Sequence, residues 1–307
     1  MNPALKNYSV EIILDSLNPH NGVRLTTMKL IYPRFIHCFR EDTEFLSQIG
    51  SEFPEWRRYD EIVALGAKIA QYDGGNISFV IPENSIKKRA DKLVTYKSTK
   101  FEMAVTPEHR MYSLRRTTNN EFIENIDLAK DWVGGFSGNR RIPQAGYLDD
   151  SLRSRSISPD ESALIAYYVA DGHRPVVGNT VQFHLKKRRK IDRIKSLLES
   201  LEIEYKEFSY AESTVIRFSP PHWVSDCYTD DGEKKYPDVL WNMSEEAFLS
   251  FKEATMESDG SVDNNEINTS SLAVADQTQI LSVLNSTAMN IRKYKGGIYK
   301  QKYQKTN

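Results

Sequence analysis

The sequence has few cysteines, no long apolar run and almost no net charge. Its 307 residues include two cysteines, Cys38 and Cys227, which are too few for a disulfide framework or for a zinc site without several histidine ligands. No run approaches the roughly 18 apolar residues of a membrane-spanning helix. The N-terminus also lacks the basic region, apolar stretch and cleavage site of a signal peptide. We therefore expect a cytoplasmic protein with no membrane partner.

The formal net charge of −1 argues against a general nucleic-acid coat, because phosphate binding needs clustered lysine and arginine. Two clusters are present, at residues 186–190 and in the tail from 292 to 305. With 39% hydrophobic residues the chain can bury real cores. Its length predicts two domains.

The first half of the chain has a β pattern. Residues 8–37 alternate apolar and polar positions around a turn at 18–22, which predicts a β-hairpin. Residues 38–118 contain short β-like runs at 77–81 and 93–96 and a helical period at 59–70, which together predict a compact β domain. Residues 119–157 are punctuated by glycine and proline and predict a linker.

Two helices in residues 158–307 end in the same dipeptide. The first has clear start signals, namely an N-cap serine, a proline and a glutamate that completes a capping box: Ser158, Pro159 and Glu161. It ends at Asp171 and Gly172, where we expect the left-handed turn that glycine permits. The second runs from Ser244 to Asp259 and Gly260.

Small residues fall in register when the helices are aligned on these aspartates: Ala166 with Ala254, and Ala170 with Ser258. Small side chains let two helices pack closely, which would bring their C-terminal carboxylates side by side. Two such carboxylates can share Mg²⁺, a hard cation that prefers oxygen ligands. An Asp-Gly pair after a single helix is also a common C-terminal turn, so the hypothesis depends on there being two.

The segments LIAYYVADGH and FKEATMESDGSV resemble the two signature helices of single-chain LAGLIDADG homing endonucleases. The resemblance implies an α+β domain of two αββαββα repeats, acting as a monomer with an internal pseudo-two-fold axis. It also implies Mg²⁺-dependent cutting of double-stranded DNA, with Asp171 and Asp259 as the catalytic metal ligands. The second helix departs from the family at Lys252, Glu253 and Glu257.

This resemblance also implies where DNA would be contacted. The basic run would contact phosphates, which position the protein without specifying sequence, through Lys186, Lys187, Arg188 and Arg189. Base reading would fall to the strand residues Gln182, His184 and Arg217, although the sequence does not show which face of a sheet they occupy. The ordinary interpretation of the run is a solvated helix start.

The segment CFREDTEFLSQIG, which begins at Cys38, resembles the first splicing block of an intein, and VTPEHRMY resembles the second. This implies an all-β Hint-like domain at residues 38–118. The Cys38 thiol would attack the carbonyl of His37, while Thr106 and His109 polarise that amide and donate protons. The ordinary alternative is a buried cysteine of a β domain.

Within residues 1–37, GVRLTTMKLIYPRFIH resembles the N-terminal strand pair of flavin-dependent thymidylate synthase. That implies an N-terminal extein without synthase activity. The chain ends in KYQKTN rather than in the His-Asn of a C-terminal splicing block, so we expect no splicing in cis, and a separate chain could supply that block.

The leading hypothesis is a homing endonuclease within an incomplete intein. One alternative is a splicing or self-cleaving element whose endonuclease domain no longer cuts. Another is a DNA-binding regulator that uses the basic run without the carboxylates.

Overall fold

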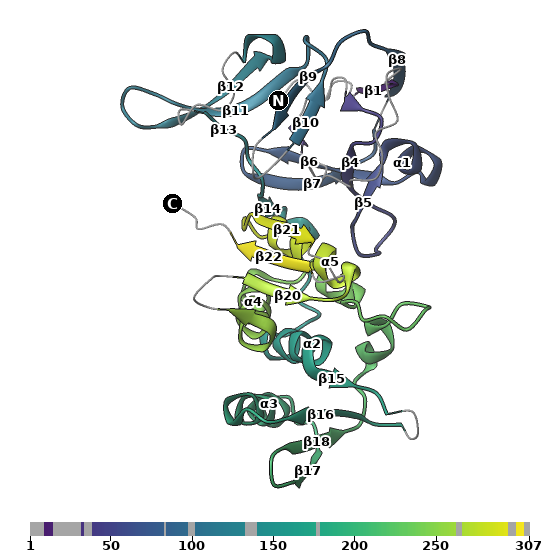
Figure 1. Ribbon diagram of the computed structural model, residues 1–307, viewed down its shortest axis with the longest axis vertical. Helices are drawn as coiled ribbons and strands as arrows, with labels where there is room; N and C mark the ends of the chain where they lie inside the picture. The colour runs from purple at the N-terminus through teal and green to yellow at the C-terminus, as the bar shows by residue number, and fades with distance from the viewer. Residues whose placement is uncertain are drawn as a thin grey trace. The chain divides into compact units, whose positions relative to one another are not determined.

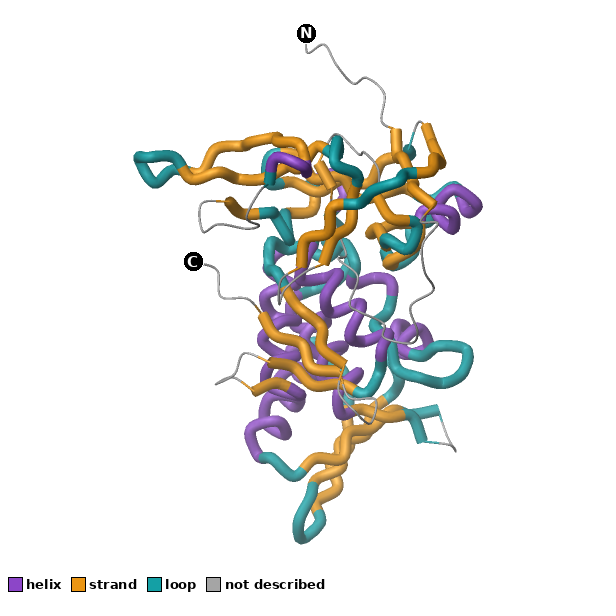
Figure 2. The backbone as a smooth tube through the Cα atoms, turned by 45° about the horizontal axis from the view of Figure 1, so that its top comes forward, coloured by secondary structure: helices purple, strands orange, loops and turns teal. Residues whose placement is uncertain are grey.

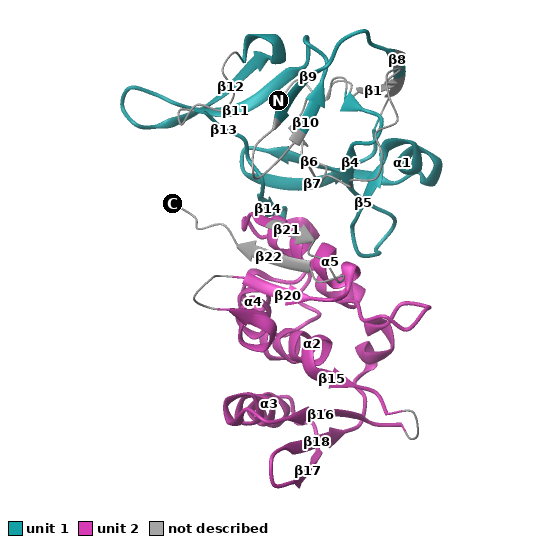
Figure 3. Ribbon diagram, in the orientation of Figure 1, with its two compact units in different colours: residues 1–149 teal, residues 150–307 magenta. Residues whose placement is uncertain are grey.

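A computed structural model describes residues 9–14, 32–33, 39–82, 84–97, 102–132, 140–175, 179–261, 266–293 and 299–303. The chain divides into two compact units, residues 1–149 and 150–307 (Figure 3). Residues 119–149, which we expected in a linker, belong to unit 1. Within the described ranges no helix is both long enough and apolar enough to cross a membrane.

Unit 1 is mainly β structure, with one short α-helix, α1 (Tyr59–Leu65), among its described residues (Figures 1 and 2). One sheet has the order β8 (Asn84–Arg89), β1 (Ser9–Leu14), β3 (Phe39–Arg40), β10 (Glu102–Val105), β9 (Val94–Lys97). A second has the order β12 (Phe122–Leu128), β11 (Arg110–Arg116), β13 (Arg140–Arg141). The third contains β14 (Tyr147–Leu148), β7 (Asn76–Val80), β6 (Lys68–Asp73), β4 (Glu44–Gln48) and β5 (Glu55–Arg58), with β2 (Tyr32–Pro33) beside β6.

The strand pairing of unit 1 corrects one expectation, the hairpin over residues 8–37. Strand β1 pairs in parallel with β3 and β8, and β2 pairs in parallel with β6. The hairpin predicted over residues 8–37 is therefore wrong for these strands, and its turn lies outside the described residues. An alternating pattern predicts an extended segment but not its partner, and these partners are distant in sequence. The runs at 77–81 and 93–96 are confirmed by β7 and β9.

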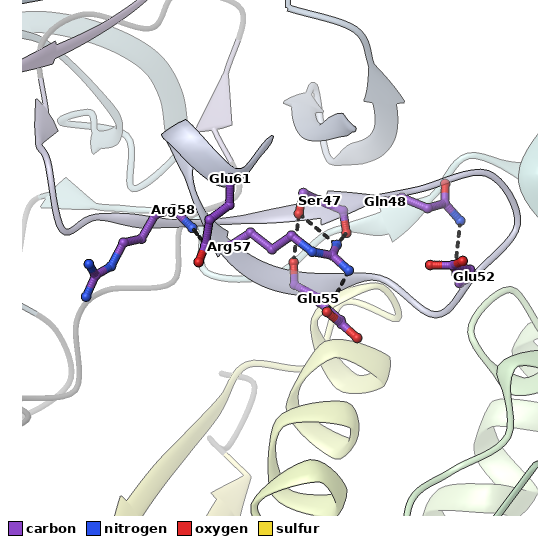
Figure 4. Close-up of polar contacts among 7 residues, drawn as sticks. All are labelled: Ser47, Gln48, Glu52, Glu55, Arg57, Arg58 and Glu61. Carbon is purple, nitrogen blue, oxygen red and sulfur yellow. Dashed lines mark hydrogen bonds and ion pairs between the residues drawn. The ribbon is translucent and has the colours of Figure 1, made fainter. Parts of the chain in front are cut away.

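The β4–β5 hairpin is closed by polar contacts (Figure 4). The Arg57 guanidinium donates to the hydroxyl of Ser47 at 3.2 Å and pairs with the Glu55 carboxylate at 2.6 Å. Ser47 in turn donates from its hydroxyl to the Glu55 carbonyl at 3.1 Å. Near the turn, Gln48 donates to the Glu52 carbonyl at 3.3 Å. These bonds satisfy the buried polar side chains of β4.

Helix α1 is shorter than its sequence pattern. Arg58, the N-cap residue, donates from its backbone N–H to the Glu61 carboxylate in the first turn at 2.9 Å. The helix ends at Gly66, whose φ of +60° is the left-handed conformation that glycine adopts readily. The helical period predicted over 59–70 therefore stops at Leu65, and strand β6 follows.

Unit 2 repeats the order helix, two strands, helix, two strands. The first set is α2 (Pro159–Asp171), β15 (Gly172–His173), β16 (Val181–Leu185), α3 (Arg188–Ser200), β17 (Tyr205–Ser209) and β18 (Thr214–Phe218). The second is α4 (Glu245–Asp259), β19 (Gly260–Ser261), β20 (Glu266–Thr269), α5 (Leu272–Val283), β21 (Met289–Lys293) and β22 (Tyr299–Tyr303). Their sheets have matching orders, β15-β16-β18-β17 and β19-β20-β22-β21.

The seventh element of the expected αββαββα repeat is not an α-helix in the first set. Between β18 and α4 lie two short 3-10 helices, η3 (His222–Cys227) and η4 (Asp238–Leu240). Residues after β22 lie outside the described part of the chain, so this expectation is not addressed for the second set.

Helices α2 and α4 lie side by side at the centre of unit 2 (Figure 1). Near their N-terminal ends the Ser162 hydroxyl donates to the Ala247 carbonyl at 2.8 Å. Ala166 and Ala254, the small residues predicted to be in register, are both buried. Because both helices begin at the same end, their final residues also lie at one end of the pair.

The predicted helix starts are confirmed. The Ser158 and Ser244 hydroxyls accept hydrogen bonds from the first turns of α2 and α4, at 3.1 and 3.2 Å. The Glu161 carboxylate, expected to complete a capping box, accepts a bond from Trp223 Nε1 at 3.1 Å. Glu161 thus pairs with a side chain distant in sequence rather than with the backbone at the start of its own helix.

Candidate functional site

Each of the paired helices ends on an aspartate and passes directly into a strand. Asp171 is the last residue of α2 and Asp259 the last of α4. The glycines that follow have φ of −76° and −91°, so the left-handed turn predicted at Gly172 is wrong. Glycine is needed there for space: a Cβ on Gly172 would lie 2.2 Å from the Tyr168 ring, and one on Gly260 would lie 2.4 Å from a backbone oxygen of α4. The chain thus turns tightly against each helix end.

The Asp171 carboxylate forms an ion pair with Lys190 Nζ, in the first turn of α3. The Lys190 side chain is 8% exposed and that of Asp171 is 26% exposed. We predicted the basic run from 186 to 190 as a solvated or phosphate-contacting segment, and for Lys190 this is wrong. Its side chain points inward to the helix ends because it has a carboxylate to pair with there.

Lys234 meets the same helix end from the loop between η3 and η4. Its Nζ donates to the carbonyl oxygens of Tyr168 at 2.8 Å, Val169 at 2.9 Å, and Gly172. The last carbonyls of a helix lack intrahelical donors and carry partial negative charge, so an ammonium group is stabilised there. Burial nevertheless lowers the pKa of Lys234 to about 8, while Cys227 and the two aspartates act in the opposite direction.

Asp259 completes what we call the charge cluster: Asp171, Lys190, Lys234 and Asp259. Burial raises the pKa of Asp259, and the negative charge of Asp171 raises it further. The ammonium groups of Lys190 and Lys234 act in the opposite direction. The two carboxylates thus lie near enough for their charges to interact, with two lysines also within electrostatic range. No pattern in the sequence pointed to Lys234, which lies in an irregular loop.

The donor set of the charge cluster fits a metal that is bound together with substrate. Among the described residues no group of three or more His, Cys, Asp and Glu side chains gathers at one place. Mg²⁺ is commonly held by only one or two carboxylates, with waters and substrate phosphates as the other ligands. Asp171 and Asp259 supply such a pair of oxygen donors, and the lysines supply charge for a phosphate.

Gln182, His184 and Arg217 occupy one face of the first sheet. Gln182 Oε1 accepts from Arg217 Nε at 3.2 Å and Nη2 at 3.1 Å, across the register pair that joins β16 to β18. His184 lies on the same exposed face, with Nε2 2.8 Å from the Ser213 hydroxyl. The opposite face packs on α2, where the Phe183 ring contacts a tyrosine. The structure therefore answers the question of faces that the sequence left open.

The Gln182–Arg217 pair has further support on both sides. Gln182 Nε2 lies 2.7 Å from His173 Nε2, and the Arg217 guanidinium lies 5.3 Å from the centroid of the Phe208 ring. Burial lowers the pKa of His173, with the positive charge of Lys234 acting in the same direction. A neutral His173 can therefore serve Gln182 as a donor or an acceptor.

The rest of the basic run lies exposed at the start of α3: Lys186, Lys187, Arg188 and Arg189. Arg188 pairs with Asp192 at 2.9 Å, one helical turn along, and Lys186 approaches Glu212 at 3.8 Å. Such exposed ion pairs contribute little stability. These cations can therefore exchange their carboxylate partners for phosphates at small cost.

The predicted splicing residues belong to unit 1. Cys38 lies outside the described residues, but the next residue, Phe39, pairs with Val105, the residue before Thr106. Thr106 and His109 are buried, and the His109 backbone N–H donates to the Thr106 carbonyl at 3.0 Å. The His109 ring lies 4.7 Å from the ring of Phe39. The two predicted blocks therefore meet in space.

No family model and no curated protein matches the sequence. Several LAGLIDADG proteins of known structure are similar to this chain. Mesophilic variants of the homing endonuclease I-DmoI match at 10% identity and a TM-score of 0.37, over 48% of this chain and 88% of that one. I-DmoI in complex with DNA and Mn matches at 10% identity and a TM-score of 0.37, over 48% of this chain and 89% of that one. The N-terminal LAGLIDADG domain of WhiA matches at 18% identity and a TM-score of 0.35, over 51% of this chain and 80% of that one. Scores this low decide neither fold nor activity.

Proposed function

We propose that unit 2 is an endonuclease that binds double-stranded DNA and hydrolyses its phosphodiester bonds with the help of a divalent cation. The observation behind the proposal is the charge cluster, in which two carboxylates and two ammonium groups meet at the ends of paired helices. The resemblance of both helices to LAGLIDADG signatures favours the same function. Each repeat contributes one aspartate, as a two-repeat endonuclease requires.

The roles of the cluster follow from its chemistry. Asp171 and Asp259 would hold Mg²⁺, which, when bound, neutralises phosphate charge and lowers the pKa of a bound water. Lys190 fixes the Asp171 carboxylate through their ion pair. Lys234, with a pKa of about 8, exchanges its proton near neutral pH. It can therefore donate a proton to the leaving oxygen or stabilise charge on it.

The exposed face of the first sheet supports duplex DNA as the substrate. Arginine pairs with guanine in the major groove through two hydrogen bonds, and glutamine pairs with adenine in the same way. Arg217 and Gln182 present these groups next to each other, held in place by their mutual bonds. His184 extends the same row. The exposed cations at the start of α3 are suited to the flanking phosphates.

Removing the metal should abolish cutting. The purified chain is incubated with a plasmid that carries an uninterrupted flavin-dependent thymidylate synthase gene, with Mg²⁺ or with EDTA, and the products are separated on a gel. We expect cleavage at one site with Mg²⁺ and none with EDTA, because the carboxylates alone cannot neutralise the phosphate. Binding without cutting in Mg²⁺ would contradict the nuclease and favour a scaffold that binds DNA only.

We also propose a second activity, cleavage of the peptide bond between His37 and Cys38 in unit 1. The specific observation is that Phe39 pairs with Val105, the last residue of β10 and the one before Thr106, and that the Phe39 ring packs against His109. In this reaction the Cys38 sulfur attacks the His37 carbonyl carbon, the C–N bond breaks and the nitrogen takes a proton, giving a thioester. An added thiol then takes the acyl group and releases residues 1–37. A separate chain with the C-terminal splicing block would be the partner for full splicing.

Dithiothreitol should therefore cut the chain after His37, as followed by mass spectrometry. We expect Cys38→Ala to abolish the cleavage, and His109→Ala to slow it by about 10²-fold or more, as for the loss of a general acid. Cys227→Ala serves as the control, because this buried thiol has a raised pKa and lies in unit 2. Failure of dithiothreitol to release residues 1–37 from the unaltered chain would refute this activity without affecting the nuclease.

A further inference from the structure

The sheet of β12, β11 and β13 in unit 1 is rich in arginine and takes no part in either proposed site. In its antiparallel register Arg116 lies opposite Phe122, Leu114 opposite Arg141, and Arg115 opposite Arg140. Opposed residues share a face of a sheet, as do alternate residues along a strand. Arg116 and Arg141 therefore share one face, while Arg115 projects from the other.

Three of these arginines have their charge available to a ligand. Arg115, Arg116 and Arg141 are exposed, and within the ranges that the structure describes no carboxylate forms an ion pair with any of them. Arg141 lies instead over the Phe122 ring, with Cζ 4.2 Å from the ring centroid. A guanidinium that stacks on an aromatic ring keeps its N–H donors for a phosphate. In contrast, Arg140 is paired with Asp127 at 3.0 Å.

The strands β11 and β12 form a two-stranded ribbon that extends away from the rest of unit 1 (Figure 1, upper left). The turn between them is polar, with Thr118, Asn119 and Asn120 exposed. A two-stranded ribbon fits the major groove of B-DNA, which is about 12 Å wide. Ile123 and Ile126 are about half exposed on the ribbon, which would also suit a protein partner. The charge favours DNA over a protein partner, because the sheet and its turn carry five arginines against three carboxylates, Glu121, Glu124 and Asp127.

We propose that the β11–β12 ribbon, together with Arg141, is a second DNA-binding surface whose arginines contact backbone phosphates. The proposal rests on the proposed function in one respect only, namely that the ligand is the same duplex. Phosphate contacts are independent of sequence. Unit 1 would thus increase the affinity for any duplex, while the recognition of bases stays with unit 2.

The test measures how DNA affinity depends on salt. A fluorescein-labelled duplex of random sequence is titrated with the full chain and with the triple variant Arg115→Ala/Arg116→Ala/Arg141→Ala, by anisotropy over a range of KCl concentrations without Mg²⁺. Each phosphate contact contributes about 0.9 to the slope of log K against log salt. Loss of three contacts should therefore make the slope less steep by roughly 2.7 and weaken binding by at least about tenfold.

Two matched variants separate this effect from general loss of charge or of folding. Lys68→Ala/Lys87→Ala/Lys92→Ala removes the same charge from exposed positions elsewhere in unit 1 and should keep the wild-type slope. Replacing the three arginines with lysine keeps the charge and should restore most of the slope. Equal slopes for the wild type and the arginine-to-alanine variant would overturn the inference. If the arginine-to-alanine variant binds more weakly with a smaller salt dependence, while the wild type does not cut DNA in Mg²⁺, the inference is supported and the nuclease is refuted.

Discussion

Asp259→Asn is expected to lower the rate of DNA cleavage by about 10²–10³-fold without weakening DNA binding. The change removes the charge that would bind the cation, and a metal contributes several kcal/mol of transition-state stabilisation, with each 1.36 kcal/mol worth about tenfold in rate. It also removes a partly buried carboxylate whose pKa is already raised by burial and by Asp171. The folded state should therefore tolerate the neutral amide.

Single-turnover cleavage of the plasmid and anisotropy with labelled duplex measure the two quantities separately. Glu253→Gln is the matched control, because Glu253 is an exposed carboxylate on the same helix, α4, outside the charge cluster. Asp171→Asn should reproduce the loss of cleavage and also leave Lys190 without its carboxylate. Cleavage by Asp259→Asn at the wild-type rate would rule out the proposed role of the carboxylates.

Lys234→Met should have the second-largest effect, a fall in cleavage rate of about 10²–10⁴-fold, as for loss of a positioned acid or base. Methionine preserves the length of the side chain but removes the ammonium group that bonds to the end of α2. With a pKa of about 8, wild-type Lys234 loses its proton as the pH rises through that value. If it donates a proton in the reaction, the wild-type rate falls above about pH 8, and the variant lacks this decline.

The shape of the pH–rate profile distinguishes chemistry from structure. A lysine that only stabilises the helix end would change the unfolding temperature but leave the profile unaltered in shape. Lys235→Met provides the control, since it makes the same change at the next residue in the chain. A profile for Lys234→Met that still declines above pH 8 would assign the titration to another group.

The sequence predicted the paired helices well because their signals are local. Ser158 and Ser244 cap the backbone within one turn, and small residues at matching positions lead to close packing. The same local reasoning was wrong at Gly172. Glycine can be required because a Cβ would collide with a neighbour or because φ is positive, and the sequence does not distinguish these two reasons.

Features that depend on distant partners could not be predicted. Lys234 reaches the charge cluster from an irregular loop, and no motif spacing connects it to Asp171. The sequence predicts Lys190 as part of a solvated basic run, whereas in the structure its ammonium group pairs with the Asp171 carboxylate. Strand β12 was assigned to a linker because glycine and proline are frequent around it, although it pairs along its length with β11.

The matching strand orders of the two repeats constrain the kind of DNA site that this chain would recognise. In the first sheet the outer face of β16 carries Gln182, which is partly exposed, and His184, which is exposed. In the second sheet Ile267 is buried and Asn268 is exposed on β20. If the proposed function holds, two similar scaffolds would present different side chains to the two halves of a duplex. A target that fits both sheets equally well would therefore not be a palindrome, and the chain would bind it in one orientation only.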